Sequence, residues 1–126
     1  MALSDHRHVW CIDFQTNFPV SPKSYTFVTA NDNSKYTFRR PRTWALLGKR
    51  GLSDKWTRLT MEETAAPGGI PKTNALPITD KTAKEYAFTD QAPKDMKYFH
   101  LEIINTWSNE RNHSMQLAEF QFNYDD

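Results

Sequence analysis

The segment MKYFHLEIINTWSNERNHSMQLAEFQF, residues 96–122, decides the fold of this chain. Apolar side chains at Phe99, Leu101 and Ile103 alternate with polar ones, which is the period of a half-buried β-strand. A second apolar run covers residues 115–122, and a polar, Asn-rich and Ser-rich loop separates the two runs. The pattern predicts an antiparallel hairpin of two strands with a long tip.

The alternation slips within the second run. Leu117 belongs to one phase and Phe120 to the other, and the slip falls at Ala118 and Glu119. An extra residue in a strand re-aims the side chains that follow, so we expect a β-bulge at this point. Bulges are common next to functional sites, which makes Glu119 a candidate functional residue.

The length and composition of the chain limit the classes of protein to which it can belong. The chain has 126 residues, 16 of them basic and 15 acidic, which indicates one domain over residues 1–126 and no overall attraction to nucleic acid or anionic membranes. No apolar run approaches the roughly 18 residues of a membrane span. Residues 1–7 are polar and predict a loose end without the features of a secretory signal. Cys11 is the single cysteine and cannot form an internal disulfide.

The remaining strands are short and follow one another at similar spacing. Residues 62–83 carry three prolines and a Gly-Gly pair, and predict a long surface loop. No amphipathic helix is evident. The pattern predicts an all-β fold, an antiparallel jelly-roll β-sandwich. Besides the hairpin, the predicted strands cover residues 10–14, 25–30, 44–48, 56–61 and 85–88.

Short motifs occur along residues 9–122 in a characteristic order. They are Asn31-Asp32, Arg39, Pro41, Trp44, Gly48, Trp56 and Ala118-Glu119. This order resembles that of the discoidin-like, or coagulation factor C-type, domains of the galactose-binding-like superfamily, which include many bacterial carbohydrate-binding modules. The resemblance implies a galactose-binding-like jelly roll, non-catalytic binding of glycans, and an extracellular or cell-surface setting.

Two features depart from the family pattern. Arg40 stands where the family usually has Asp before the proline. The family's first strand and the Asp/Asn-rich loop after it have no counterpart, so we expect a sandwich without the usual first strand.

The resemblance also implies a calcium ion that braces the fold. The family's residues at the positions of Ala118 and Glu119 contribute a backbone carbonyl and a carboxylate to it. Calcium takes six to eight oxygen ligands, and the family's other ligands come from the N-terminal loop that has no counterpart here. Two interpretations of Glu119 remain open: a calcium ligand, or a carboxylate held by backbone amides at a bulge.

Residues 35–50 are basic, with no acidic residue and with aromatic side chains between the charges. Arginine forks suit carboxylates and sulfates, so the segment could bind an acidic or sulfated sugar or a phosphate. For Arg39 we favour a structural ion pair with Asp32. For Lys35, Tyr36 and Arg40, ligand binding and simple solvation both remain open.

The loop at residues 105–114 offers an aromatic ring among polar groups. An indole can stack on the apolar face of a pyranose while amide, Arg and His groups hydrogen-bond the hydroxyls. In related carbohydrate modules this tip lies at the same end as the loop after the Asn-Asp strand. The alternative is that Trp107 folds back to cover the sandwich end. The candidate ligand-binding residues are Trp107, Tyr36 and Asn109, with Arg40, Arg111 and His113 as hydrogen-bond donors.

The other tryptophans and the acidic residues give no sign of catalysis. Trp10, Trp44 and Trp56 fall on strand phases that face a core, and we expect them to pack there. The chain has no nucleophile elbow, phosphate loop, zinc motif or Cys-x-x-Cys. We therefore expect a protein that is not an enzyme.

The sequence favours a non-catalytic carbohydrate-binding module that targets a larger, secreted protein to glycans. The alternative is a protein-interaction or structural accessory domain that packs on a partner or a catalytic domain, since one fold serves both. A weaker option is binding of anionic lipid or nucleic acid through residues 35–50, which should weaken steeply with salt.

Overall fold

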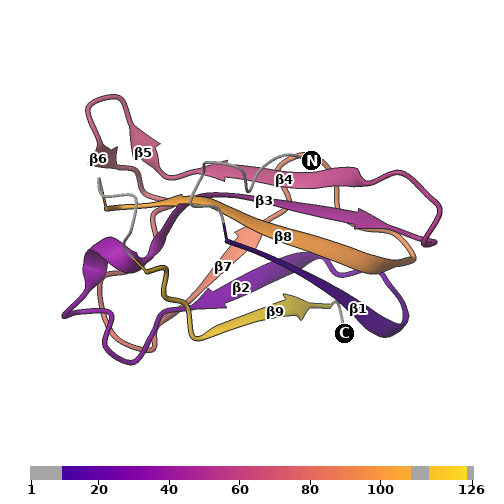
Figure 1. The fold of residues 1–126 in the computed structure, drawn as a ribbon, viewed down its shortest axis with the longest axis horizontal. Helices are drawn as coiled ribbons and strands as arrows, with labels where there is room; N and C mark the ends of the chain where they lie inside the picture. The colour runs from indigo at the N-terminus through magenta and orange to yellow at the C-terminus, as the bar shows by residue number, and fades with distance from the viewer. Residues whose placement is uncertain (1–9, 109–113, 125–126) are drawn as a thin grey trace.

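The computed structural model describes residues 10–108 and 114–124, and two antiparallel sheets dominate it (Figure 1). One sheet has four strands in the order β1-β8-β3-β4, and the other has three in the order β7-β2-β9. The sheets pack face to face, which confirms the predicted all-β antiparallel sandwich. The strands are β1 (Trp10–Val20), β2 (Ser24–Val28), β3 (Pro41–Lys49), β4 (Thr57–Glu63), β5 (Ala65–Ala66), β6 (Ile70–Pro71), β7 (Ala83–Ala87), β8 (Met96–Thr106) and β9 (Glu119–Asn123).

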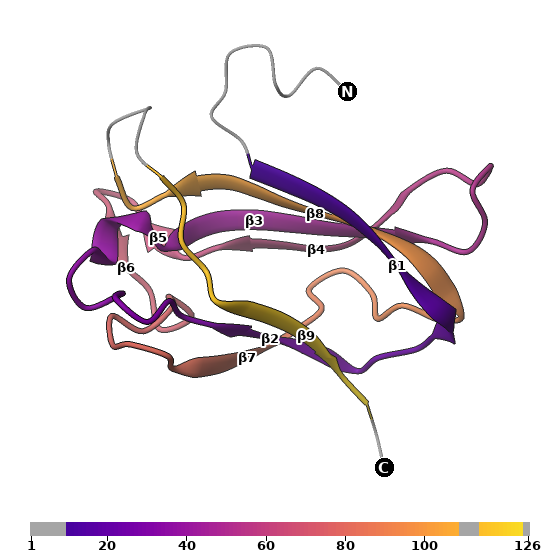
Figure 2. The ribbon, with the colours of Figure 1, turned by 60° about the horizontal axis from the view of Figure 1, so that its bottom comes forward.

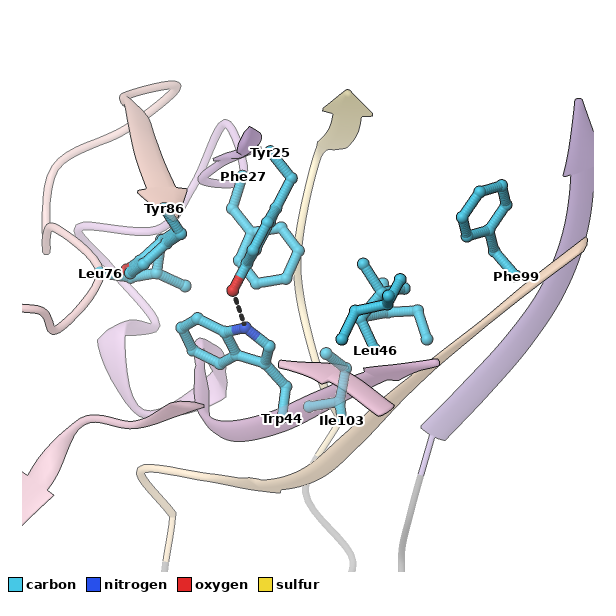
Figure 3. Packing of buried hydrophobic residues seen from close by; sticks show 10 residues of the cluster. Tyr25, Phe27, Trp44, Leu46, Leu76, Tyr86, Phe99 and Ile103 are labelled. Atoms are coloured by element: carbon cyan, nitrogen blue, oxygen red, sulfur yellow. Dashed lines mark hydrogen bonds between the residues drawn. The ribbon is translucent and has the colours of Figure 1, made fainter. Parts of the chain in front are cut away.

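Aromatic side chains from both sheets fill the space between them (Figure 3). Tyr25 and Phe27 of β2 and Trp44 of β3 are completely buried. The rings of Phe27 and Trp44 meet edge to face with their centroids 4.8 Å apart. Aromatic rings of this size bury much area each and dominate the energetics of a small core. The core is therefore built on aromatic contacts between β2 and β3.

The predicted hairpin of residues 96–122 is wrong. The two strands lie in different sheets, because β8 pairs with β1 and β3 while β9 pairs with β2. Phe99 of β8 and Phe122 of β9 instead face each other across the core with centroids 4.8 Å apart. The alternation correctly identified the buried faces of both strands. Side-chain period does not, however, reveal whether two apolar faces belong to paired or to facing strands.

The predicted β-bulge at Ala118 and Glu119 is also wrong. β9 starts at Glu119 and pairs with β2 in an unbroken register, from Val28 opposite Glu119 to Ser24 opposite Asn123. Residues 114–117 have no regular structure. The change of phase in the sequence therefore marks the beginning of the strand.

Two further segments differ from expectation. β1 continues to Val20 through residues that predicted a turn, with its register shifting after Gln15. The region 62–83 includes the end of β4 and the small β5–β6 hairpin. Gly68 and Gly69 at the tip of this hairpin have φ values of +87° and +78°. Residues that carry a Cβ rarely adopt such values, so glycine suits both positions. Leu76 in the same region is 2% exposed and belongs to the core.

The tryptophans divide between core and surface. Trp44 is buried as predicted, and Trp10 is half-buried against the edge of the core. Trp56 contradicts its prediction, because it precedes β4 and keeps 39% of its surface exposed. A residue outside the strand does not follow the strand's inward and outward alternation.

The loops gather at the two ends of the sandwich. The 3-10 turn η2 (Thr37–Arg39) and the C-terminal end of β8 lie at one end, and the β3–β4 turn lies at the other (Figures 1 and 2). Within the described ranges, no helix is long and apolar enough to cross a membrane.

Candidate functional site

Arg40 joins the loop after β2 to the end of β8. Its guanidinium carbon lies 4.7 Å from the ring centroid of Trp107, and that of Arg42 lies 5.9 Å away. Both distances are within the range of a cation–π contact. The loops predicted to form the site, residues 31–43 and the start of 105–114, are therefore side by side at one end of the sandwich (Figure 2).

Arg40 is itself 6% exposed. Its Nε donates a hydrogen bond to the carbonyl of Leu76 over 3.0 Å, and its Nη1 donates to the carbonyl of Thr37 over 2.8 Å. Burial disfavours the charged form and lowers the pKa of Arg40. The side chain therefore ties its own loop to the loop of Leu76 and to Trp107, a role that the sequence did not indicate.

Trp107 is half-buried, and its ring lies against the Arg40 guanidinium. Its indole nitrogen is buried and has no hydrogen-bond partner among the described residues. A buried donor of this kind costs about 1–3 kcal/mol if it stays unpaired. The ring is therefore partly covered and partly exposed. Its two predicted roles, stacking on a sugar and covering the sandwich end, both stay predictions.

Tyr36 is half-buried beside two basic side chains. The Arg39 guanidinium carbon lies 4.1 Å from its ring centroid, and Lys35 Nζ lies 5.5 Å from it. The structure forms no ion pair between Arg39 and Asp32, both of which it describes, so this prediction is wrong. Aromatic rings are the partners of the Arg39 guanidinium instead. Its backbone carbonyl accepts a 2.9 Å hydrogen bond from the amide of Gln116.

A buried asparagine anchors the loop that carries Tyr36. Asn33 is 1% exposed, and its Nδ2 donates to the carbonyls of Pro77 and Thr79 over 2.8 and 3.0 Å. The amide of Ser34 donates to Asp80 Oδ1 over 2.6 Å. These bonds fix residues 31–36 against residues 77–80. A loop held in this way loses little conformational freedom when a ligand binds.

The remaining predicted ligand-binding residues, Asn109, Arg111 and His113, lie outside the described residues. Their assignment stays a prediction.

Ala118 and Glu119 are exposed at the rim of a groove between β1, β8 and β9. The groove has a volume of about 290 Å³, and apart from Cys11 and Glu119 its lining is apolar. No group of three or more His, Cys, Asp or Glu side chains able to hold a metal occurs in the part of the chain that the structure describes. One carboxylate beside an apolar groove does not make a site for an ion that takes six to eight oxygens. Calcium therefore stays a prediction of the resemblance alone.

Comparison of the chain with protein-family models and with curated proteins gives no match. The resemblance to discoidin-like domains rests on the sequence motifs.

Proposed function

We propose that this chain is a non-catalytic carbohydrate-binding module of the galactose-binding-like kind, which attaches a larger secreted or cell-surface protein to glycans. The observation that carries the proposal is the stacking of Arg40 on Trp107, because it holds an aromatic ring beside the anchored loop of Tyr36. A fixed aromatic surface next to polar loops suits a pyranose, whose C–H face is apolar and whose hydroxyls need partners.

Each residue has a distinct role in this proposal. Trp107 and Tyr36 offer ring surface to the sugar. Asn109, Arg111 and His113 supply hydrogen bonds from the loop that follows Trp107. Arg40 acts as a positioning residue, since carbonyl groups already use two of its donors.

The test is a glycan array followed by isothermal titration calorimetry on the carbohydrates that bind. We expect Trp107→Ala to weaken binding at least tenfold, because the stacking surface is lost. Tyr124→Ala is the matched control, since Tyr124 is an aromatic residue with 48% exposure on another part of the surface. An array without any binding would contradict the function, and unchanged binding by Trp107→Ala would contradict the site.

An accessory domain that packs on a partner is the second candidate. Two large apolar side chains of the edge strand β1 support it: Phe18 is 76% exposed and Ile12 is 59% exposed. Exposed apolar groups on a sheet edge suit contact with another protein surface. Co-purification with a neighbouring domain, lost in Phe18→Ser but kept in Ser53→Ala, would favour this function.

On the basis of the resemblance, we also propose that Ala118 and Glu119 contribute ligands to a calcium ion. The melting temperature in calcium and in a chelator tests it, with Glu119→Gln as the comparison. A melting temperature that calcium does not change would contradict the proposal. Glycan binding that falls steeply with salt would instead point to the basic segment 35–50.

A further inference from the structure

We propose a second carbohydrate-binding site, in a cleft around Trp56 at the end of the sandwich opposite to Trp107. The ligand class rests on the proposed function, but the residues and the location are independent of it. The cleft has a volume of about 460 Å³, within the range of small-molecule sites. Trp56 and Leu52 line it from the β3–β4 turn, and Tyr98 lines it from the start of β8. These two segments lie at the same end of the sandwich (Figure 1).

Trp56 is presented at the surface rather than packed in the core. It keeps 39% exposure although Phe14 and Phe99 of the core form part of the same cleft. An aromatic ring that stays exposed does not contribute the stability that its burial in the core would give. Such a ring beside a cleft is a natural surface for a ligand with an apolar face.

The ring is held in place by neighbouring side chains. The His100 ring lies 5.8 Å from the Trp56 ring, and both of its nitrogens have partners. Nδ1 is hydrogen-bonded to Asp13, and Nε2 lies 3.2 Å from Glu102 Oε1. Lys49 Nζ lies 4.4 Å from the centroid of Trp56. His100 therefore has a fixed orientation against Trp56, and the aromatic surface is arranged before a ligand arrives.

The polar lining selects for a neutral ligand with both donors and acceptors. The Asp13 side chain is 71% exposed and uses Oδ1 for His100, which leaves its second oxygen as an acceptor. Gln15 supplies a donor and an acceptor, and Lys49 supplies donors. Asp13 and Lys49 carry opposite charges, so neither an anion nor a cation is favoured overall. A pyranose matches this lining, because its hydroxyls both donate and accept while its ring face stacks on indole.

The test is an NMR titration of the ¹⁵N-labelled protein with cellohexaose, xylohexaose and mannohexaose as probes. The chain has four tryptophans, so each indole N–H signal reports on one location once it is assigned. We expect the Trp56 signal to shift to saturation with at least one probe. We also expect Trp56→Ala to weaken that binding at least tenfold. Met61→Ala is the matched control, because Met61 is also 39% exposed and lies on β4.

Each outcome separates the two sites. A shift of the Trp56 signal without one at Trp107 supports the second site and overturns the loop-end site. A shift at Trp107 alone overturns the second site and leaves the proposed function standing. A titration in which neither signal moves overturns both. The signals of the unmodified protein decide the result even if Trp56→Ala does not fold.

Discussion

The indole nitrogen of Trp44 donates a hydrogen bond to the hydroxyl oxygen of Tyr25 over 2.9 Å, and both residues are completely buried (Figure 3). Trp44 belongs to β3 and Tyr25 to β2, so this bond connects the two sheets. It satisfies a buried donor that water cannot reach. The first prediction tests how much the fold depends on it.

Replacement of Tyr25 by Phe removes the acceptor and leaves the Trp44 N–H buried without a partner. We expect Tyr25→Phe to lower the free energy of unfolding by about 1–3 kcal/mol, the cost of such an orphaned group. Urea denaturation measures the change, and Tyr124→Phe, at an exposed position, should have little effect. Equal stability of the two variants would show that the bond contributes nothing net.

Alkaline pH should destabilise the protein through its buried tyrosines. Burial raises the pKa of Tyr25 and of Tyr86, so the folded state keeps both phenols protonated where the unfolded state ionises. Their contribution to stability is fully present below the unfolded pKa of about 10 and is lost as pH rises above it. Above pH 10, each of the two tyrosines should lower the free energy of unfolding by about 1.4 kcal/mol per pH unit.

Urea titrations at pH 9, 10 and 11 measure this dependence. The variant Tyr25→Phe/Tyr86→Phe should lose stability less steeply above pH 10, because it has neither phenol. A slope identical to that of the unmodified protein would exclude the two tyrosines as the cause.

Arg40 should be needed both for stability and for the position of Trp107. Arg40→Met keeps much of the apolar stem but leaves the carbonyls of Leu76 and Thr37 without their donors. We expect a loss of about 1.5–3 kcal/mol, as for hydrogen bonds to charged groups, and a shifted indole signal of Trp107. Arg50→Met is the control, since the hydrogen bond of Arg50 to the carbonyl of Lys94 is exposed. Unchanged stability and an unchanged Trp107 signal in Arg40→Met would contradict this role.

Gly48 should not accept a side chain. A Cβ at this position would lie 2.8 Å from Met96 Sδ, 3.0 Å from Leu59 Cδ1 and 3.2 Å from Phe99 Cδ1. Overpacking of this kind typically costs about 1–3 kcal/mol, so Gly48→Ala should lower the midpoint of urea unfolding. Gly51→Ala meets only the flexible Asp54 carboxylate and should be milder. Equal effects of the two substitutions would argue against crowding.

The sequence predicted the buried faces better than the partners of the strands. The period-two pattern correctly identified Phe99, Leu101 and Ile103 as core residues, because alternation is a local property of a strand. The pairing of β9 with β2 depends on residues about a hundred positions apart. Nothing in the local pattern of either strand encodes that distance.

The role of Arg40 could not be predicted for a related reason. Its partner at Leu76 is a backbone carbonyl, which every residue possesses, so the sequence carries no sign of it. Trp56 was misassigned because its strand starts one residue later than its apolar pattern suggested. The juxtaposition of the loops at residues 31–43 and at Trp107 came from the resemblance.

The crossing of the chain from β8 to β9 has a consequence during biosynthesis. β2 carries Tyr25 and Phe27, and within the described residues one of its two edges is paired with β9. While the ribosome is still making β9, this backbone edge has exposed amides and carbonyls that another nascent chain could capture. Slow elongation after β8, or an early stop there, should therefore favour aggregation, and supply of the β9 segment as a separate peptide should suppress it.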